Sequence, residues 1–413
     1  MARILVIGGS LGGLLAANML LRAGHEVRVL EKAAASLDGR GAGIVTHKPL
    51  MTALERCGLN VDASLGVAVE RRVVLGPDGS TVAEAHINQI LTSWSRLYAM
   101  LRSAFDDSLY VTGASVLQLV QRVDGVSVLC DDGRSFEADL AVASDGIRSA
   151  VRAQFMPQVQ AEYAGYVAWR GVCDESVLSR STLGSVFDTF GFGLPPGEQL
   201  IGYPVAGAGN TIARGQRRYN FVWYRPATEQ SLKDLMTDAD GNHFPQGIAP
   251  NKVAWQHVAA ARQAARELLA PQFAEILEKT AQPFLQPIYD CASPTMAFGR
   301  VALMGDAAFV ARPHVGMGVT KAAEDAMALT GCIATHGANP AALQAFEQVR
   351  LAPCAAVVQR ARVLGAYMQS QRLSHSDAKT QNRSCTRDAR TVMLETAIDL
   401  SVASAVPATL FTA

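Results

Sequence analysis

The residues with the clearest chemical meaning form a glycine-rich turn near the start of the chain, Gly8-Gly9-Ser10-Leu11-Gly12-Gly13. A turn of this kind at the start of a helix leaves backbone N–H groups free to bind a pyrophosphate, as in dinucleotide sites. Gly8 permits the turn and Gly13 permits close helix packing, whereas Ser10 replaces the usual second glycine. Glu31, followed by Lys32, ends the next apolar run, and its carboxylate can accept hydrogen bonds from a ribose diol.

The elements around this turn are those that such a site needs. Ile4 to Ile7 is an apolar run typical of a buried parallel strand. A buried helix that Gly24 ends is then indicated by Ala16, Ala17, Met19, Leu20 and Leu21. Glu26 to Leu30 then predicts a second strand. This βαβ unit indicates a dinucleotide site, but NAD and FAD share the ADP half that it binds.

A second segment favours a flavin. Residues 301–304 predict a strand that leads into Gly305-Asp306, and a loop with Pro313 then precedes Gly316, Gly318 and Val319 at the start of a helix. Asp306 can bind a polyol such as the ribityl chain, and free amides at the helix start suit the negative charge of a reduced flavin. A third strand ends in the same way, at Asp145-Gly146.

Together the three segments resemble those of the single-component FAD-dependent aromatic-ring hydroxylases related to p-hydroxybenzoate hydroxylase. The chain departs from the family pattern at Ser10, at Phe309 and at Arg312, and it keeps Asp306 and Pro313. Further segments are most similar to the subgroup that contains 2,6-dihydroxypyridine 3-hydroxylase. They are Tyr163–Val172, Ile201–Pro204, Tyr219–Tyr224 and Arg312–His314.

The predicted fold class is α/β, with a Rossmann-like FAD-binding domain of the glutathione-reductase-like type interleaved with an α+β substrate domain. Long alternating strands between residues 165 and 224 predict that the substrate domain carries an antiparallel sheet. C-terminal helices complete the chain. The predicted FAD-binding domain comprises residues 1–70, 98–162 and 286–335, the substrate-binding domain residues 71–97 and 163–285, and the C-terminal helical region residues 336–413.

The resemblance also suggests catalytic residues. His47 lies on a strand that in this family passes the flavin toward the substrate, which suggests a catalytic base. The alternative is that His47 is an ordinary solvent-exposed histidine at the end of a strand. His314 follows Pro313, and a near-neutral pKa would suit it to deprotonate a ring hydroxyl. Tyr203 is the third candidate, because it precedes Pro204 on a substrate-sheet strand. The strands of this sheet also carry Trp169, Arg170, Trp223 and Tyr224. These residues are candidates for the site only if their side chains face the flavin.

Two arginines join the predicted FAD ligands. The family places an FAD-contacting arginine near Arg96, at the start of a predicted helix, and Arg40 precedes the Gly41 turn. Each has an ordinary alternative as a solvent-exposed charge. We find no metal-ligand spacing among the cysteines and histidines, so no metal site is predicted.

The resemblance implies an FAD-dependent aromatic monooxygenase. NADH or NADPH would reduce FAD, O2 would form the C4a-hydroperoxyflavin, and this species would hydroxylate an aromatic ring activated by a hydroxyl group. A hydroxypyridine is the first choice of substrate, and a phenol of the salicylate or hydroxybenzoate type is the second. A flavin redox enzyme without oxygen insertion and a silent flavin-binding scaffold remain alternatives. No second glycine-rich βαβ unit is seen, so the nicotinamide cofactor is expected to bind transiently.

Composition excludes several other classes. The 413 residues contain 37 basic and 37 acidic residues, which argues against a nucleic-acid partner. No apolar stretch is long enough to cross a bilayer, and the apolar N-terminus reads as part of the fold. Seven scattered cysteines fit reduced thiols in the cytoplasm. A monomer or a homodimer is expected.

Overall fold

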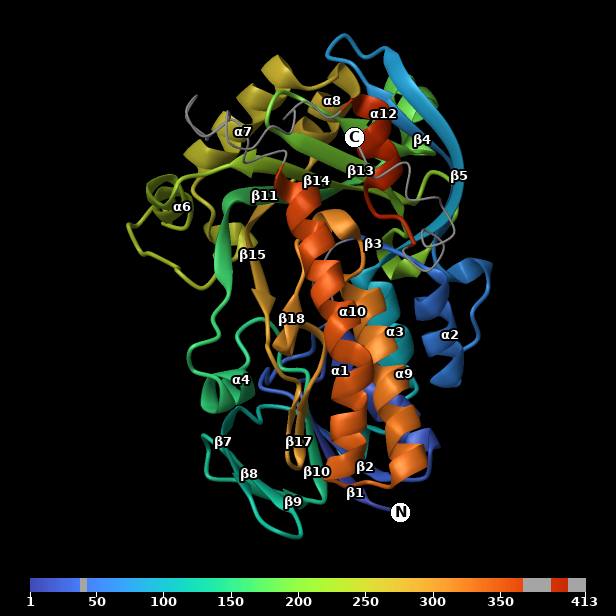
Figure 1. The fold of residues 1–413 in the computed structure, drawn as a ribbon. Coiled ribbons are helices and arrows are strands. Elements are labelled where there is room, and N and C mark those ends of the chain that lie inside the picture. Colours follow the sequence, from blue (N-terminus) through green and yellow to red (C-terminus); the bar gives the residue numbers. More distant parts are fainter. Residues whose placement is uncertain (38–42, 367–387, 400–413) are drawn as a thin grey trace.

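The computed structural model describes residues 1–37, 43–366 and 388–399, and Arg40 therefore lies outside the described residues. Two large sheets occupy opposite ends of the molecule, and two long helices, α9 and α10, lie alongside both (Figure 1). The α/β fold class is confirmed.

The first sheet has six strands and contains the predicted βαβ unit. Its strand order is β16-β17-β10-β1-β2-β6, with every pair parallel except the one between β16 and β17. Parallel strands buried on both faces need continuous apolar runs, and β10 is buried at all four of its residues. The strands are β1 (Arg3–Ile7), β2 (Glu26–Leu30), β6 (Tyr110–Val111), β10 (Leu140–Ala143), β16 (Ala297–Phe298) and β17 (Val301–Leu303).

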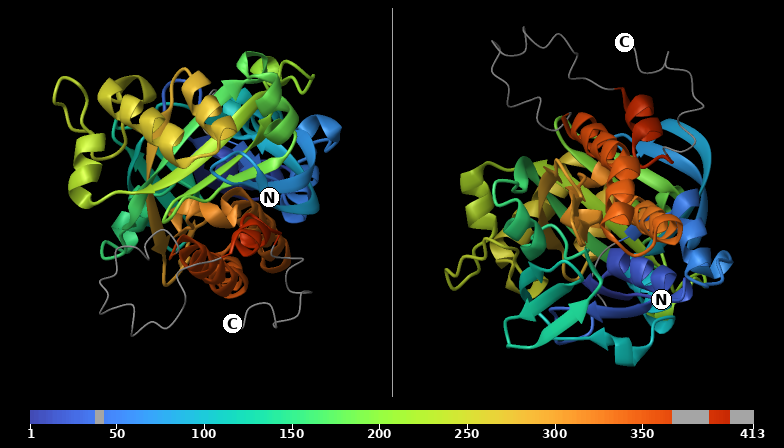
Figure 2. Two further views of the ribbon diagram at one scale, coloured as in Figure 1. Left: turned by 90° about the horizontal axis from the view of Figure 1, so that it is seen from above. Right: turned by 60° about the horizontal axis from the view of Figure 1, so that its bottom comes forward.

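Helices cover this sheet, and α1 packs against both α3 and α9. A small sheet of three antiparallel strands lies at the base of the molecule, next to α4 (Figure 2). These elements are α1 (Leu11–Arg22), α2 (Lys48–Arg56), α3 (Trp94–Ser103), α4 (Ala150–Phe155), α9 (Gly318–His336), β7 (Val116–Gln121), β8 (Val126–Cys130) and β9 (Ser135–Ala138).

The second sheet has nine strands in the order β18-β15-β11-β14-β13-β12-β4-β5-β3. It is antiparallel, as predicted for the substrate domain, except that β12 and β4 run parallel. The strands are β3 (Gly43–Val45), β4 (Val67–Leu75), β5 (Thr81–Ser93), β11 (Glu162–Asp174), β12 (Phe190–Gly193), β13 (Gln199–Val205), β14 (Arg218–Pro226), β15 (Phe284–Ala292) and β18 (Phe309–Val310).

Alternation along the strands gives this sheet two faces with different partners. The outer face carries Trp169 and Trp223 in an apolar cluster with helices α7 (Trp255–Leu268) and α8 (Pro271–Lys279). The second of these helices begins at Pro271, because proline suits the first position of a helix. The inner face carries Tyr166, Tyr203 and Tyr224, which cluster with Met393 and Ala397 from the C-terminal segment.

The C-terminal helices join the two sheets. Helix α10 (Pro340–Ala366) packs against α9 and against strands β15 to β18, and α12 (Ala389–Glu395) contacts β4 and β5. Two short helices connect strands of the second sheet along the chain: α5 (Arg180–Thr182) lies between β11 and β12, and α6 (Glu229–Leu235) between β14 and β15.

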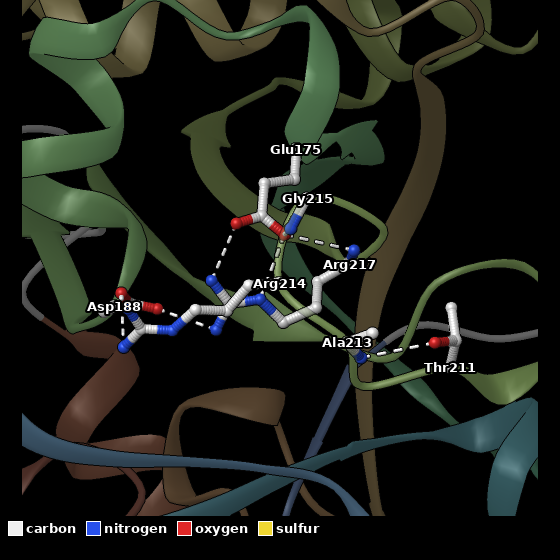
Figure 3. A network of polar contacts seen from close by, with 7 residues as sticks. All are labelled: Glu175, Asp188, Thr211, Ala213, Arg214, Gly215 and Arg217. Atoms are coloured by element: carbon white, nitrogen blue, oxygen red, sulfur yellow. Dashed lines mark hydrogen bonds and ion pairs between the residues drawn. The ribbon is translucent and has the colours of Figure 1, made fainter.

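A buried ion-pair network closes one end of the nine-stranded sheet (Figure 3). The Arg217 guanidinium donates through Nη2 to Glu175 Oε1 at 2.7 Å and through Nη1 to Asp188 Oδ1 at 2.8 Å. Glu175 Oε2 also accepts from the backbone N–H groups of Gly215 and Arg217. Arg217 and Glu175 are the buried ion pair of this network, and each of their charges has hydrogen-bonding partners. A buried ion pair is tolerated only under this condition.

Candidate functional site

The predicted pyrophosphate turn borders a cavity of about 340 Å³ at the carboxyl ends of β1, β2 and β10. Gly8, Ser10, Glu31, Lys32 and Asp145 all line it. These residues lie far apart in the sequence, and the parallel sheet brings them together because its strands end at one edge. This cavity is the expected place for the ADP half of a dinucleotide.

Two glycines of the turn are required by geometry. Gly8 has φ +98°, and a Cβ there would lie 2.4 Å from the Ser144 carbonyl oxygen. A Cβ on Gly13 would lie 1.9 Å from the Gly8 carbonyl oxygen. Ser10 caps α1 without using its hydroxyl in a capping bond, and Leu11 begins the helix. The serine thus leaves the amides of the first turn available.

Glu31 and Asp145 have one structural role each and keep acceptor capacity toward the cavity. Glu31 accepts N–H bonds from Gly9 and Ala33, both at 2.8 Å. Asp145 Oδ2 accepts from the Ala150 amide at 2.8 Å, whereas its Oδ1 is buried without a hydrogen-bond partner. Burial raises the pKa of Asp145. An unpartnered carboxylate oxygen at this cavity is an observation that a cofactor hydroxyl would explain.

Asp306 lies in the turn after β17, where it is accessible yet surrounded by protein groups. Burial raises its pKa, and Lys321 and Arg152 oppose that rise while Asp325 adds to it. Asp325 also shapes the turn, because its Oδ2 accepts the Gly305 N–H at 3.0 Å. An exposed carboxylate in this turn suits the expected polyol contact.

The loop after Asp306 leads to the start of α9. Pro313 begins a single 3₁₀ turn that ends at Gly316, whose φ is +66°. Helix α9 begins at Gly318, so the amides of Gly318 and Val319 lie in a first turn that has no intrahelical acceptors for its N–H groups. These groups are placed as the sequence predicts for binding the polar edge of a flavin.

His47 lies between β3 and α2 and is 3% exposed. Its Nδ1 is 3.0 Å from Thr320 Oγ1 on α9, and its Nε2 is buried without a hydrogen-bond partner. Burial lowers the pKa of His47, Arg72 lowers it further, and Asp399 opposes both. The ring is therefore neutral near pH 7 and is oriented by one nitrogen, with the other able to accept a proton.

A cavity of about 860 Å³ adjoins His47. It lies between α2, strands β4 and β5, and helix α12, and Arg72, Leu394 and Asp399 also line it. Its volume is within the range of small-molecule sites.

Tyr203 lies on the inner face and is 3% exposed. It packs so closely on β3 that a Cβ on Gly43 would lie 2.4 Å from the tyrosine ring. Asn220, its partner in register on β14, accepts the Gly43 N–H at 2.9 Å and leaves its Nδ2 buried without a partner. Burial raises the pKa of the Tyr203 hydroxyl, so this group is a hydrogen-bonding acid and not an anion near pH 7.

His314 is completely buried against the inner face. Its Nε2 is 2.9 Å from the Tyr166 hydroxyl, and its ring centroid is 4.0 Å from that of Tyr224. Burial, assisted by Arg312, lowers the pKa of His314 to about 3. The near-neutral pKa expected from the residue type does not hold here, because the loss of water and the charge of Arg312 both disfavour the protonated ring. His314 can act only as a neutral hydrogen-bonding group around pH 7.

Among the three catalytic candidates, His47 lines the larger cavity, whereas Tyr203 and His314 line neither cavity. Arg96 donates to the Ser64 hydroxyl at 3.0 Å and does not line the dinucleotide cavity. Trp169 and Trp223 belong to the apolar cluster on the outer face of the sheet. Because only residues that face the flavin were candidates for the site, these two tryptophans are no longer candidates. Tyr224 stays on the inner face.

Sequence reasoning missed three residues that the structure places around this site. They are Asp325, which holds the Gly305 turn, Asn220, and Arg72, which is completely buried and donates to backbone carbonyls of the C-terminal segment. The i, i+4 pair of Lys321 and Asp325 in an apolar helix was a usable signal for the first. Arg72 and Asn220 gave none, because their partners are distant in the chain.

Comparison with known proteins agrees with this geometry. The family model described as an FAD binding domain matches residues 1–177 and 249–361, and one described as FAD binding domain-like matches residues 163–290. The 2,6-dihydroxypyridine 3-monooxygenase of Paenarthrobacter nicotinovorans is 30% identical over 368 residues, which are 89% of this chain and 91% of the relative. The 3-hydroxybenzoate 6-hydroxylase of Polaromonas naphthalenivorans is 25% identical and covers 89% and 88%.

A solved structure gives the same result for the fold. The 2,6-dihydroxypyridine-3-hydroxylase from Arthrobacter nicotinovorans has a TM-score of 0.84 with 30% identity, over 89% of this chain and 93% of that chain.

The fold and the two cofactor loops define a flavoprotein of the FAD-dependent aromatic monooxygenase class. The chain belongs to the FAD-binding-domain family, and its homologues include hydroxypyridine and hydroxybenzoate hydroxylases. FAD is the cofactor of this family, and the unpartnered Asp145 oxygen, the Gly13 contact and the exposed α9 amides fit it.

Two further findings concern the described residues only. None of their helices combines the length and the apolar character needed to cross a membrane. Within the same ranges, no three histidine, cysteine or acidic side chains gather as metal ligands would.

Proposed function

We propose that this protein hydroxylates an aromatic ring that already carries a hydroxyl group, with a hydroxypyridine as the preferred substrate. The relative with 30% identity over 89% of the chain is a 2,6-dihydroxypyridine 3-monooxygenase, and this likeness supports the choice of ring. The net reaction takes two electrons from NADH or NADPH, inserts one atom of O2 into a C–H bond of the ring and releases the other as water. Bound FAD supplies the oxygen activation.

The roles that we propose for the protein's own residues rest on one observation. Polar atoms of His47, Asn220, Tyr224 and His314 are buried on the substrate side without partners, which is costly unless a ligand satisfies them. His47 is the proposed base for the ring hydroxyl, because its pKa is lowered and its Nε2 is available. Tyr203 and the neutral His314 are proposed to hold the ring by hydrogen bonds.

The binding sites for the other reactants follow from the fold. The described residues contain one parallel sheet with one glycine-rich βαβ unit, and we assign this unit to FAD. We therefore propose that the nicotinamide cofactor binds transiently. We also propose that the enzyme is soluble and cytoplasmic and that it acts as a monomer or a homodimer.

The test uses purified protein loaded with FAD. NADH oxidation is measured with 2,6-dihydroxypyridine, 6-hydroxynicotinate, salicylate and 3-hydroxybenzoate, and products are analysed by mass spectrometry under ¹⁸O2. We expect stimulation and one labelled oxygen with a hydroxypyridine. A phenolic acid that alone gives labelled product would move the assignment to the second substrate class. Stimulated NADH oxidation with no labelled product from any ring would contradict hydroxylation.

A further inference from the structure

The cavity of about 860 Å³ beside His47 is lined by large apolar side chains, most of which are not fully buried. They come from α2, from strands β4 and β5, and from the C-terminal segment with α12. These side chains are Met51, Val69, Ile87, Ile90, Leu394 and Ile398. Val69 is buried, Leu394 is 36% exposed, and the other four are half-buried. Large apolar side chains gathered around one hollow are typical of a site that binds an apolar group.

Three polar side chains of the same cavity wall are already bonded to the protein. Arg72 donates to three backbone carbonyls of the C-terminal segment and, through Nε, to Gln89 Oε1 at 2.8 Å. Gln89 also donates to one of these carbonyls at 3.3 Å, and Asp399 accepts the Lys48 N–H at 3.1 Å. His47 differs from them, because its Nε2 is buried without a hydrogen-bond partner. The wall therefore offers a ligand one buried polar atom at His47 and apolar side chains beyond it.

The cavity is also larger than a single ring needs. Its volume lies in the upper part of the range for drug-sized ligands, about 300–1,000 Å³, whereas a hydroxypyridine is one small ring. Within the described ranges, none of the residues proposed to bind FAD lines this cavity. With a ring hydroxyl at His47 Nε2, space remains for a further part of the same molecule.

We propose that the substrate ring carries an apolar substituent, such as an alkyl chain, and that this cavity binds the substituent while the ring hydroxyl faces His47. Leu394 on α12 and Ile87 on β5 are the specificity-determining residues. Both line the cavity, and neither belongs to an apolar core cluster of the described residues. An alkyl chain packed on them removes the apolar surface of both partners from water. This proposal rests on the proposed function and deepens it by naming what the ring carries.

Two series of neutral esters test the proposal. FAD-loaded protein with the full chain is titrated with the methyl, butyl and heptyl esters of 6-hydroxynicotinate and of 4-hydroxybenzoate, following the flavin absorbance. Wild type is compared with Leu394→Asp and Ile87→Asp, which place a charge on two different elements around the cavity. Leu268→Asp is the matched control, because Leu268 is also a leucine in the last turn of a helix, is also 36% exposed, and does not line the cavity.

In wild type, each buried methylene should tighten binding by about threefold to fourfold, so affinity should rise from methyl to butyl in at least one series. The two cavity variants should retain FAD, bind the methyl ester within about twofold of wild type, and lose most of the gain with chain length. Leu268→Asp should keep this gain. If one cavity variant loses FAD, the other decides. Flat or falling affinity in both wild-type series, or an equal gain in all four proteins, would overturn the proposal.

Product analysis under ¹⁸O2 separates this proposal from the proposed function. A wild type that hydroxylates rings but shows no gain with chain length contradicts only the proposal about the substituent. A wild type that forms no labelled product from any ring or ester contradicts the proposed function itself. A gain that appears only in a chain shortened after Asp399 would assign the cavity to residues 400–413 and overturn the proposal.

Discussion

The dinucleotide turn and the inner face of the nine-stranded sheet differ in how many of their buried polar atoms have partners. At the turn, both Glu31 oxygens and Asp145 Oδ2 accept bonds from backbone amides, the glycines are set by contacts with backbone oxygens, and Asp145 Oδ1 is without a partner. On the inner face, Arg170, Asn220, Tyr224 and His314 keep buried atoms without partners. A rigid site can bind a permanent cofactor, whereas unsatisfied side chains favour a ligand that comes and goes.

The largest expected effect is on the substrate side. His47→Gln should slow hydroxylation by about 10²–10⁴-fold, the usual contribution of a general base, and should raise the hydrogen peroxide formed per NADH. The pKa of His47 is lowered by burial, so wild-type activity should be level above pH 6.5 and should fall on the acid side as the ring is protonated. Product and peroxide are measured across pH, with the exposed His86→Gln as the control. A variant with wild-type rate and coupling would place the base elsewhere.

The next effect is at the turn. Gly13→Ala puts a methyl group 1.9 Å from the Gly8 carbonyl oxygen, and the backbone of both strand and helix would have to move. We expect a loss of roughly 3 kcal/mol or more in folding or FAD affinity, read as FAD retained after gel filtration. Gly331→Ala in α9 has free space around the added carbon and is the matched control. Full FAD content in Gly13→Ala would show that the turn is less rigid than described.

A smaller change is expected at the second cofactor loop. Asp306→Ala removes the proposed acceptor for the ribityl chain, and it should weaken FAD binding by about 1.5–3 kcal/mol. Fluorescence titration of the apoprotein with FAD measures this. Glu84→Ala, which removes an exposed partner of Arg71 on β5, should leave affinity unchanged. Equal affinity in the Asp306 variant would remove it from the cofactor contacts.

The smallest effect is on acid stability. His314 is neutral in the fold down to about pH 3, but in the unfolded chain it takes a proton near pH 6.5. Stability due to this residue is therefore constant above pH 6.5 and falls below it by about 1.4 kcal/mol per pH unit. Urea unfolding of wild type and His314→Asn at pH 7, 6 and 5 should show the difference between them shrinking. Parallel curves would mean that His314 is not buried as a neutral ring.

The same contrast explains what sequence could reveal. Gly8, Gly13 and Glu31 fall within one contiguous βαβ unit, so local spacing predicted the fold of that end and a dinucleotide as its ligand, without deciding between NAD and FAD. The inner face is assembled from β11, β13, β14 and the Pro313 loop, and only the strand register decides that Tyr224 faces inward and Trp223 outward. The low pKa of His314 depends on complete burial, which a residue type cannot indicate. The predicted domain boundaries and site roles stay predictions.

The bonds from Arg72 have a consequence for synthesis of the protein. Its guanidinium donates to the carbonyls of Met393, Thr396 and Ala397, which are 321 to 325 residues further along the chain. A ribosome must therefore add at least the 321 residues that separate Arg72 from Met393 before this cation finds these acceptors. Until then, Arg72 on β4 has the nearby Gln89 as an acceptor for its Nε, but its Nη1 and Nη2 lack these three carbonyls. The substrate end of the molecule is thus completed only after residue 397 has been made, while the βαβ unit near residue 1 has its local partners as soon as it emerges.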